Sequence, residues 1–179
     1  MPNLWITSDT HFGHRSIFHD SKCPGRKAWC GNSIEEHDAA LTKIWNSKVA
    51  PEDYVIHLGD FAFGGVPRQK AYRDALNGHL WIALGNHDSL SKTAYRTRVM
   101  RPYDIIQDWL RFEYRGKKIF CKHVPYEFTE KETSEHDELW HGHVHDRKYA
   151  PPTLKHRAWG VDRQEDLISL LGNKEEVLF

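Results

Sequence analysis

The chain has 179 residues, of which 39% are hydrophobic and 28% charged, as is usual for a globular protein. This length fits a single domain over residues 1–179, with a core that needs no disulfide. The 25 Lys and Arg residues balance the 25 Asp and Glu residues, which argues against binding to nucleic acid or an anionic membrane through bulk charge. No segment has the pattern of a transmembrane span or a signal peptide, so we expect no membrane association and a cytoplasmic location.

The first half of the chain alternates short apolar runs with amphipathic segments. Strands are predicted over residues 4–7, 53–58 and 80–84, and helices over residues 33–48 and 67–77. Ser33 can cap the first helix, with Glu36 three residues later, and Gly78 follows the second helix. This order predicts parallel strands joined by crossover helices.

Strands dominate the second half of the chain. Residues 104–114 and 117–122 predict a hairpin that turns at Arg115 and Gly116, followed by short strands over residues 139–141 and 166–171. Residues 22–30 and 128–137 are predicted to be loops that could line a pocket.

Polar clusters follow five of the predicted strands directly. They are Asp9 with His11, Asp60, Asn86 with His87 and Asp88, His123, and His143 with His145. In open α/β sheets ligands bind beyond the carboxyl ends of the strands, so these clusters should converge on one edge. Side chains at positions i and i+2 of an extended segment point the same way, which lets Asp9 act with His11, and His143 with His145. A glycine before Asp60, Asn86 and His143 permits tight turns and close approach of the backbone.

The residue types in these clusters indicate a metal site. The chain has 13 histidines, and His is the commonest metal ligand. Carboxylate, amide and imidazole ligands without a thiolate suit manganese first, with iron, zinc or nickel as alternatives, rather than calcium or a structural zinc. Seven ligands are too many for one ion but suit two divalent ions if one carboxylate bridges them. Cys23 and Cys30 have no matching ligand pair nearby, so no separate zinc site is expected there.

Each motif alone is weak, because Asp, Asn and His are common in turns, but the ordered set is specific. The series DxH, GD, GNHD, a lone His and GHxH runs from Asp9 to His145. It resembles the signature of the calcineurin-like metallophosphoesterase superfamily. The sequence SDTHFGH at residues 8–14 further resembles small bacterial and phage members. The resemblance implies a four-layer α/β/β/α sandwich with mixed sheets and a metal site at the carboxyl ends of the strands.

The resemblance also implies a role for each residue of the motifs. Asp9, His11 and His145 would hold one metal, Asn86, His123 and His143 the other, and Asp60 would bridge them. His87 would protonate the leaving oxygen, and Asp88 would orient the ring of His87. Two departures from the family pattern leave the ligands in place: His123 does not follow a glycine, and Trp140 stands where an aliphatic residue is usual.

The substrate is harder to infer than the site. His14 and Arg15 could contact a substrate phosphate or cap the segment that follows them. The balanced charge favours a small phosphomonoester or phosphodiester, such as a nucleotide or a nucleic-acid end, over a long polyanion. A protein phosphatase is an alternative, although the short chain offers little material for an extended groove. A non-catalytic metal-binding module is a further alternative, disfavoured because every ligand position and His87 are filled.

Overall fold

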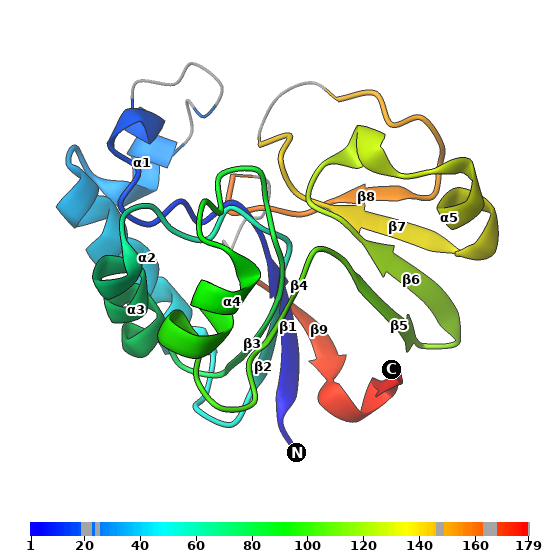
Figure 1. The fold of residues 1–179 in the computed structure, drawn as a ribbon, viewed down its shortest axis with the longest axis horizontal. Coiled ribbons are helices and arrows are strands. Elements are labelled where there is room, and N and C mark those ends of the chain that lie inside the picture. The colour runs from blue at the N-terminus through cyan, green and yellow to red at the C-terminus, as the bar shows by residue number, and fades with distance from the viewer. Residues whose placement is uncertain (19–22, 24–25, 146–148, 163–167, 179) are drawn as a thin grey trace.

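A computed structural model describes residues 1–18, 23, 26–145, 149–162 and 168–178. Two five-stranded sheets face each other, and most of the helices lie outside the first sheet (Figure 1). Both sheets mix parallel with antiparallel pairing, so the predicted α/β class with mixed sheets is confirmed.

The first sheet has the strand order β4-β3-β2-β1-β9. Its strands are β1 (Asn3–Thr7), β2 (Tyr54–His57), β3 (His79–Ala83), β4 (Ile105–Gln107) and β9 (Ser169–Asn173). The first four are parallel to one another, and β9 is antiparallel to β1. Thr7 pairs with His57, and His57 pairs with Ile82, so the carboxyl ends of β1, β2 and β3 lie side by side.

The second sheet has the strand order β10-β5-β6-β7-β8. Its strands are β5 (Leu110–Tyr114), β6 (Lys117–Cys121), β7 (Glu138–His141), β8 (His156–Ala158) and β10 (Val177–Leu178). β6, β7 and β8 are parallel, whereas β10, β5 and β6 pair antiparallel. The second sheet therefore presents the carboxyl ends of β6 and β7 together.

Helices cover the outer face of the first sheet (Figure 1). They are α1 (Arg26–Cys30), α2 (Ile34–Lys48), α3 (Val66–Ala75), α4 (Lys92–Ala94) and the π-helical segment η2 (Tyr95–Val99). Alternate residues of β3 face opposite sides: Leu80 and Ile82 belong to the core under the helices, and Trp81 to the core between the sheets. Within the described ranges, no helix is both long and apolar enough to cross a membrane.

The outer helical layer on the second sheet is small. It consists of α5 (Glu130–Glu135), which follows the 3-10 turn η3 (Pro125–Glu127). His136 at the end of α5 packs on Phe120 of β6, with ring centroids 4.8 Å apart. Two further 3-10 turns are η1 (Arg15–Phe18) and η4 (Lys174–Glu176). The fourth layer of the predicted sandwich is thus a single short helix.

The predicted strands and helices of the first half are confirmed within one or two residues. Ser33 caps α2, since its hydroxyl accepts a hydrogen bond of 3.1 Å from the nitrogen of Glu36. The predicted hairpin is also confirmed: β5 and β6 turn at Arg115 (φ 50°) and Gly116 (φ 71°), which fits a tight turn with two left-handed residues.

Residues 104–114 were wrongly predicted to form one strand. They form β4 in the first sheet and β5 in the second, with bends at residues 108–109. Ile106 belongs to the core under the helices, whereas Leu110 belongs to the core between the sheets. The sequence did not reveal that the chain passes from the first sheet to the second here, because apolar residues alternate on both sides of the bend as they would in one continuous strand.

The two predicted loops also contain helices. Residues 22–30 include α1, although residues 22, 24 and 25 lie outside the described part. Residues 128–137 include α5, which Thr129 and Glu132 cap reciprocally. The spacing of Thr129 and Glu132 is a capping-box signal visible in the sequence. The predicted strand over residues 166–171 corresponds to β9, and residues 166 and 167 lie outside the described part.

Candidate metal centre

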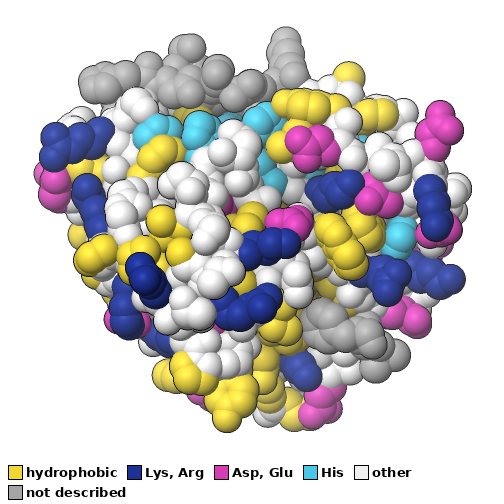
Figure 2. All heavy atoms as spheres, in the orientation of Figure 1, with side chains coloured by type: hydrophobic (Ala, Val, Ile, Leu, Met, Phe, Trp, Pro, Cys, Tyr) yellow, Lys and Arg dark blue, Asp and Glu magenta, His cyan; other side chains and the backbone are white. Residues whose placement is uncertain are grey.

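The predicted ligands all lie just beyond the carboxyl ends of five strands from both sheets. Asp9 and His11 follow β1, Asp60 follows β2, Asn86 follows β3, His123 follows β6, and His143 and His145 follow β7. Figure 2 shows histidine side chains gathered along the upper edge of the molecule in this view. The two sheets therefore bring to one edge side chains that are up to 136 positions apart in the chain.

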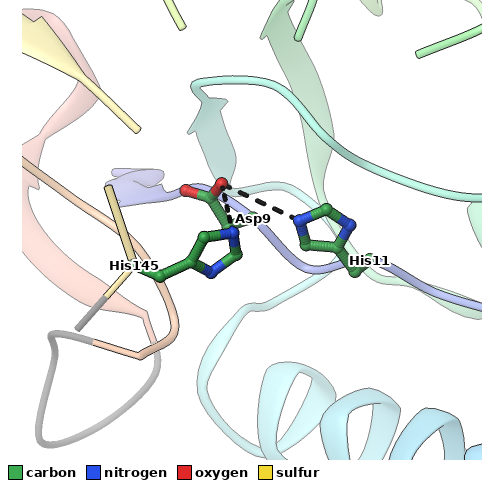
Figure 3. Close-up of side chains that lie close together, drawn as sticks. All are labelled: Asp9, His11 and His145. Carbon is green, nitrogen blue, oxygen red and sulfur yellow. Dashed lines mark ion pairs between the residues drawn. The ribbon is translucent and has the colours of Figure 1, made fainter. Parts of the chain in front are cut away.

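The first cluster contains Asp9, His11 and His145, whose ligand atoms all lie within 4.8 Å of one another (Figure 3). The Oδ1 atom of Asp9 is 3.9 Å from His11 Nε2 and 3.6 Å from His145 Nε2. All three residues are buried. One carboxylate oxygen thus faces two imidazole nitrogens.

The second cluster contains Asp60, His123 and His143, again with ligand atoms within 4.8 Å of one another. The Oδ2 atom of Asp60 is 3.1 Å from His123 Nε2. Asn86 joins this cluster from the exposed side, since its Oδ1 atom lies 2.9 Å from His143 Nδ1. The structure therefore brings the Asn86 amide to the same ligands as predicted.

Asp60 lies between the two clusters. Its Oδ2 atom is 3.5 Å from Nε2 of His11 in the first cluster and 3.1 Å from Nε2 of His123 in the second. The other carboxylate is also shared, because Asp9 Oδ1 lies 4.0 Å from His123 Nε2. This arrangement suits two adjacent cations with a carboxylate between them.

In each of the four histidines, the ring nitrogen that points away from the cluster (the outer nitrogen) makes a hydrogen bond, and the other (the inner nitrogen) faces the cluster. The partners are His14 Nδ1 for His11 (3.2 Å), the Leu58 carbonyl for His123 (2.6 Å), the Tyr126 hydroxyl for His143 (2.7 Å) and the Asp162 carboxylate for His145 (2.6 Å). A carbonyl only accepts, so Nδ1 of His123 must donate its proton to Leu58. Such contacts select the tautomer whose inner nitrogen can bind a metal.

The inner nitrogens provide the test of whether these residues fit metal ions. The Nε2 atoms of His11 and His123 are fully buried, and neither makes a hydrogen bond within the described part of the chain. Buried polar atoms almost always have a partner, so an unpaired one calls for an explanation such as an ion. Asp60 Oδ2 lies 3.5 Å from Nε2 of His11 and 3.1 Å from Nε2 of His123, which is close enough for these atoms to bind the same ion. The mixed set of oxygen and nitrogen ligands suits Mn, Fe, Zn or Ni. The residues fit divalent metal ions.

The charges of the site are tightly coupled. Burial raises the pKa of Asp9. Burial alone would also raise the pKa of Asp60, but the nearby His123, whose Nε2 atom lies 3.1 Å from Asp60 Oδ2, outweighs it through its charge, so this pKa is lowered. Burial lowers the pKa of His11 well below its usual range. Burial would lower the pKa of His123 too, but Asp60 and Asp9 raise it to about 9. A bound cation would replace that proton as the partner of the carboxylates.

The ligand loops also have a strained backbone. Among the described non-glycine residues with positive φ, five are predicted ligands: Asp9 (58°), His11 (50°), Asp60 (56°), His143 (69°) and His145 (47°). This conformation is uncommon for residues other than glycine and costs free energy. Its concentration at these positions indicates that the loops are held in a geometry that serves the site.

Glycines allow the loops to come close together, as predicted. At Gly59 (φ 94°) an added Cβ would lie 2.6 Å from the backbone nitrogen of Gly85 and 2.7 Å from His123 Nδ1. At Gly142 it would collide with the side chains of Ser8 and Asp9. Real side chains do not tolerate such distances, so both positions require glycine.

His87 lies beside the first cluster. Its ring is exposed, 5.6 Å from the ring of His11 and 5.3 Å from that of Phe63 between centroids. Its backbone nitrogen donates a hydrogen bond of 2.8 Å to Asp60 Oδ1, the carboxylate between the clusters. His87 can therefore reach a group bound over the clusters.

The predicted contact between Asp88 and the His87 ring was wrong: no hydrogen bond joins these two described side chains. The Asp88 carboxylate instead accepts hydrogen bonds from the backbone nitrogens of Asp60 (2.8 Å), Phe61 (2.9 Å) and Gly85 (2.7 Å). It points into the protein, where burial raises its pKa to about 6. Asp88 holds the loops that follow β2 and β3 together.

Residues 2–173 match the family of calcineurin-like phosphoesterases. The chain belongs to this family. It is similar to the Gene 66 protein of Mycobacterium phage D29, with 30% identity over 198 residues covering 95% of this chain and 93% of that protein. The Gene 66 protein of Mycobacterium phage L5 is 26% identical, with 99% of each chain covered. A solved structure of a protein of unknown function from Aquifex aeolicus shares the fold, with a TM-score of 0.68, 22% identity, and coverage of 95% of this chain and 96% of that one.

The family implies divalent metal binding, and the two clusters are candidate ligand sets for it in this calcineurin-like phosphoesterase. Of the two residues predicted to contact substrate, His14 lies beside the first cluster. His14 stacks on Phe63 with ring centroids 3.9 Å apart and is hydrogen-bonded to His11, whereas Arg15 is exposed at the start of η1. His14 is thus a neighbour of a candidate ligand.

Sequence reasoning missed three residues at this site: Arg26, Tyr126 and Asp162. Tyr126 and Asp162 hold His143 and His145, and Arg26 holds Asp162. None belongs to a motif, and Arg26 and Asp162 are 136 positions apart. The only local signals were the two segments expected to line a pocket: residues 22–30 contain Arg26, and residues 128–137 begin just after Tyr126.

Proposed function

We propose that this protein is a dinuclear phosphoesterase that hydrolyses a small, nucleotide-like phosphomonoester or phosphodiester. The observation that carries this proposal is the pair of adjacent clusters, joined through Asp60, in which buried imidazole nitrogens of His11 and His123 have no hydrogen-bond partner. Family membership independently supports a metal-dependent phosphoesterase.

In this proposal the seven residues divide between two divalent ions, with manganese as the first choice. Asp9, His11 and His145 would hold one ion, Asn86, His123 and His143 would hold the other, and Asp60, which lies between the clusters, would serve both. When bound, two such ions activate a water molecule as the nucleophile and offset the charge of the phosphoryl oxygens. The chain's own residues supply the remaining functions.

His87 acts as the general acid. Its exposed ring borders the first cluster, and its backbone is anchored to Asp60, so the ring can stand over a bound phosphate. The ring donates a proton to the leaving oxygen as the bond from phosphorus breaks. A positioned acid of this kind contributes about 10²- to 10⁴-fold to turnover.

Two aromatic side chains border the clusters and favour a substrate with a flat group such as a nucleobase. Phe63 stacks on His14 beside the first cluster, and Tyr126, 70% exposed, is hydrogen-bonded to His143 beside the second. Phe63 is half-buried with one face against His14, so Tyr126 is the exposed aromatic ring that can stack on a base. Among the residues that the structure describes, no comparable feature beside the clusters favours an extended peptide groove.

The proposal is tested with metal-free protein to which manganese, iron, zinc or nickel is added separately. An aryl phosphomonoester and the matching aryl phosphodiester serve as paired substrates. We expect hydrolysis of at least one ester in a metal-dependent manner. Hydrolysis of neither ester with any metal would instead support a non-catalytic metal-binding module. Activity on phosphopeptides but not on nucleotides would favour a protein phosphatase.

A further inference from the structure

A buried ion pair connects α1 to the residues that follow β8. Arg26 and Asp162 form two parallel hydrogen bonds, from Nε to Oδ1 at 2.8 Å and from Nη2 to Oδ2 at 2.5 Å. The side chains of both residues are almost completely buried, at 0% and 1% exposure. Burying two charges is costly unless they meet further hydrogen-bond partners. The further partners of Arg26 and Asp162 therefore indicate the role of the pair.

On one side of the pair, Arg26 contacts the backbone of the DxH motif and, through Nη1, the Nε2 atom of His37 on α2 at 3.4 Å. Arg26 Nη2 donates to the carbonyl oxygen of Asp9 at 2.8 Å, and Nη1 donates to that of Thr10 at 3.2 Å. Asp9 has a left-handed backbone (φ 58°), so its peptide needs such support. Arg26 therefore fixes the strained turn that carries Asp9.

On the other side, the pair acts on His145. Asp162 Oδ2 accepts a hydrogen bond of 2.6 Å from His145 Nδ1. The opposite ring nitrogen, Nε2, then faces Asp9 Oδ1 at 3.6 Å. A carboxylate behind an imidazole fixes its tautomer and strengthens it as a metal ligand.

We infer that the Arg26–Asp162 pair positions Asp9 and His145 and thereby sets the metal affinity of the first cluster alone. This inference rests on the proposed function, which places one ion at that cluster. Among the described contacts, the second cluster uses other supports: the Leu58 carbonyl behind His123 and the Tyr126 hydroxyl behind His143. The two metal positions thus have separate supporting residues.

Asp162 could alternatively belong to a third cation site, since Cys23, His145 and Asp162 also lie within 4.8 Å of one another. The hydrogen bonds argue against this reading. Both oxygens of Asp162 are already engaged by Arg26, and the adjacent guanidinium would repel a further cation. A positioning role is consistent with every contact of the pair.

The chain contains a matched control pair away from the clusters. Arg73 and Asp104 form the same two-hydrogen-bond arrangement, at 2.8 Å each, with side-chain exposures of 1% and 0%. Arg73 likewise donates to backbone carbonyls, those of Leu76 and Gly78. Loss of this pair should affect stability but not the metal clusters.

The test compares manganese binding by the full-length wild-type protein with that of Asp162→Asn and Asp104→Asn. Metal-free protein is titrated by calorimetry, and its thermal unfolding is measured separately. Asn keeps the shape of Asp162 but loses the charge. We expect Asp162→Asn to keep one equivalent at wild-type affinity and to weaken the other by about 10- to 100-fold. Asp104→Asn should keep both at wild-type affinity.

A double-mutant cycle with His145→Ala identifies the affected position. If Asp162 acts through His145, adding Asp162→Asn to His145→Ala should cause no further loss of manganese affinity. Adding Asp104→Asn to His145→Ala should leave manganese affinity unchanged as well, which controls for loss of stability. Arg26→Lys is a second variant, which keeps the positive charge but cannot form the two parallel hydrogen bonds. It should also weaken one manganese equivalent and leave the other unchanged, and it replaces Asp162→Asn if that variant does not fold.

The outcomes distinguish a positioning role of the Arg26–Asp162 pair from an effect on general stability, and both from failure of the proposed function. Equal weakening of both equivalents in Asp162→Asn, or weakening of neither, would overturn the inference while leaving the proposed function intact. A loss in Asp104→Asn as large as that in Asp162→Asn would also overturn it, because the effect would then be one of general stability. A wild-type protein that binds no metal would overturn the proposed function, and the inference with it.

Discussion

The Oδ2 atom of Asp88 accepts a hydrogen bond of 2.8 Å from the backbone nitrogen of Asp60, the residue that lies between the two ligand clusters. Asp88 thus acts on the backbone of a candidate ligand rather than on the ring of its neighbour His87. The same carboxylate binds the backbone of Gly85, so the turns after β2 and β3 are held at a fixed separation. This separation sets where Asp60 and Asn86 stand.

We therefore expect Asp88→Asn to destabilise the protein. The amide offers one acceptor oxygen and places an NH2 group against backbone N–H donors, which should lower the free energy of unfolding by about 1–3 kcal/mol. Chemical denaturation of the metal-free protein measures this change. If Asp88 oriented His87 instead, the variant would unfold like the wild type and show only an altered pH profile of turnover.

His87→Ala, in contrast to Asp88→Asn, should lower turnover and leave stability unchanged. The ring is exposed and is not a member of either ligand cluster. Turnover on an ester with a poor leaving group should fall by about 10²- to 10⁴-fold, while metal content and unfolding stay unchanged. An ester whose leaving group needs no proton should be affected much less. Loss of metal in this variant would show that His87 is a ligand.

Metal binding should depend on pH through His123. In the metal-free protein the pKa of His123 is raised to about 9 from the usual 6.5, so the ring carries a proton at neutral pH. A metal must displace that proton, so manganese affinity should rise with pH and level off above about pH 9. The raised pKa stabilises the metal-free fold most fully below pH 6.5, and this stabilisation is lost as the pH rises through about 9.

Titrations with manganese across this pH range, in buffers that do not bind the metal, measure the effect. Proton release can be followed with an indicator dye in weakly buffered solution. His123→Asn, which removes the titrating ring, should flatten the pH dependence. An affinity that is constant between pH 7 and 9 in the wild-type protein would contradict the expectation.

Tyr126→Phe should weaken the second metal position selectively. The substitution removes only the hydroxyl that lies 2.7 Å from His143 Nε2. Loss of such an outer contact lowers metal affinity by about 10-fold or more. Calorimetry should show one unchanged equivalent and one weakened equivalent. Tyr103→Phe is a control, because Tyr103 is 80% exposed and its ring lies near His79 at the amino end of β3. Equal behaviour of the two variants would count against a role for Tyr126.

The positions of the candidate ligands could be predicted because each directly follows a strand and parallel strands end at a common edge. Asp9 and Asp60 are a clear example, since β1 and β2 pair in register up to Thr7 and His57. The left-handed backbone at Asp9, His11 and Asp60 could not be predicted, because nothing in those residue types demands a positive φ.

The supporting residues could not be predicted from local pattern either. Asp162 meets His145 only because the chain returns to the site after β8, and Arg26 reaches Asp162 from α1. Asp88 was assigned wrongly because adjacency in sequence suggested contact with His87, whereas successive residues of a turn point in different directions. By contrast, α5 could have been found from the spacing of Thr129 and Glu132.

The central claim is that the two clusters bind two metal ions that act together on a phosphoester. The most direct test is a titration of metal-free wild-type protein with manganese, in which binding and aryl phosphoester hydrolysis are followed in the same sample. We predict two equivalents bound per chain, with hydrolysis rising as the second equivalent binds. Full hydrolysis with one equivalent, or two equivalents bound without hydrolysis of either ester, would contradict it.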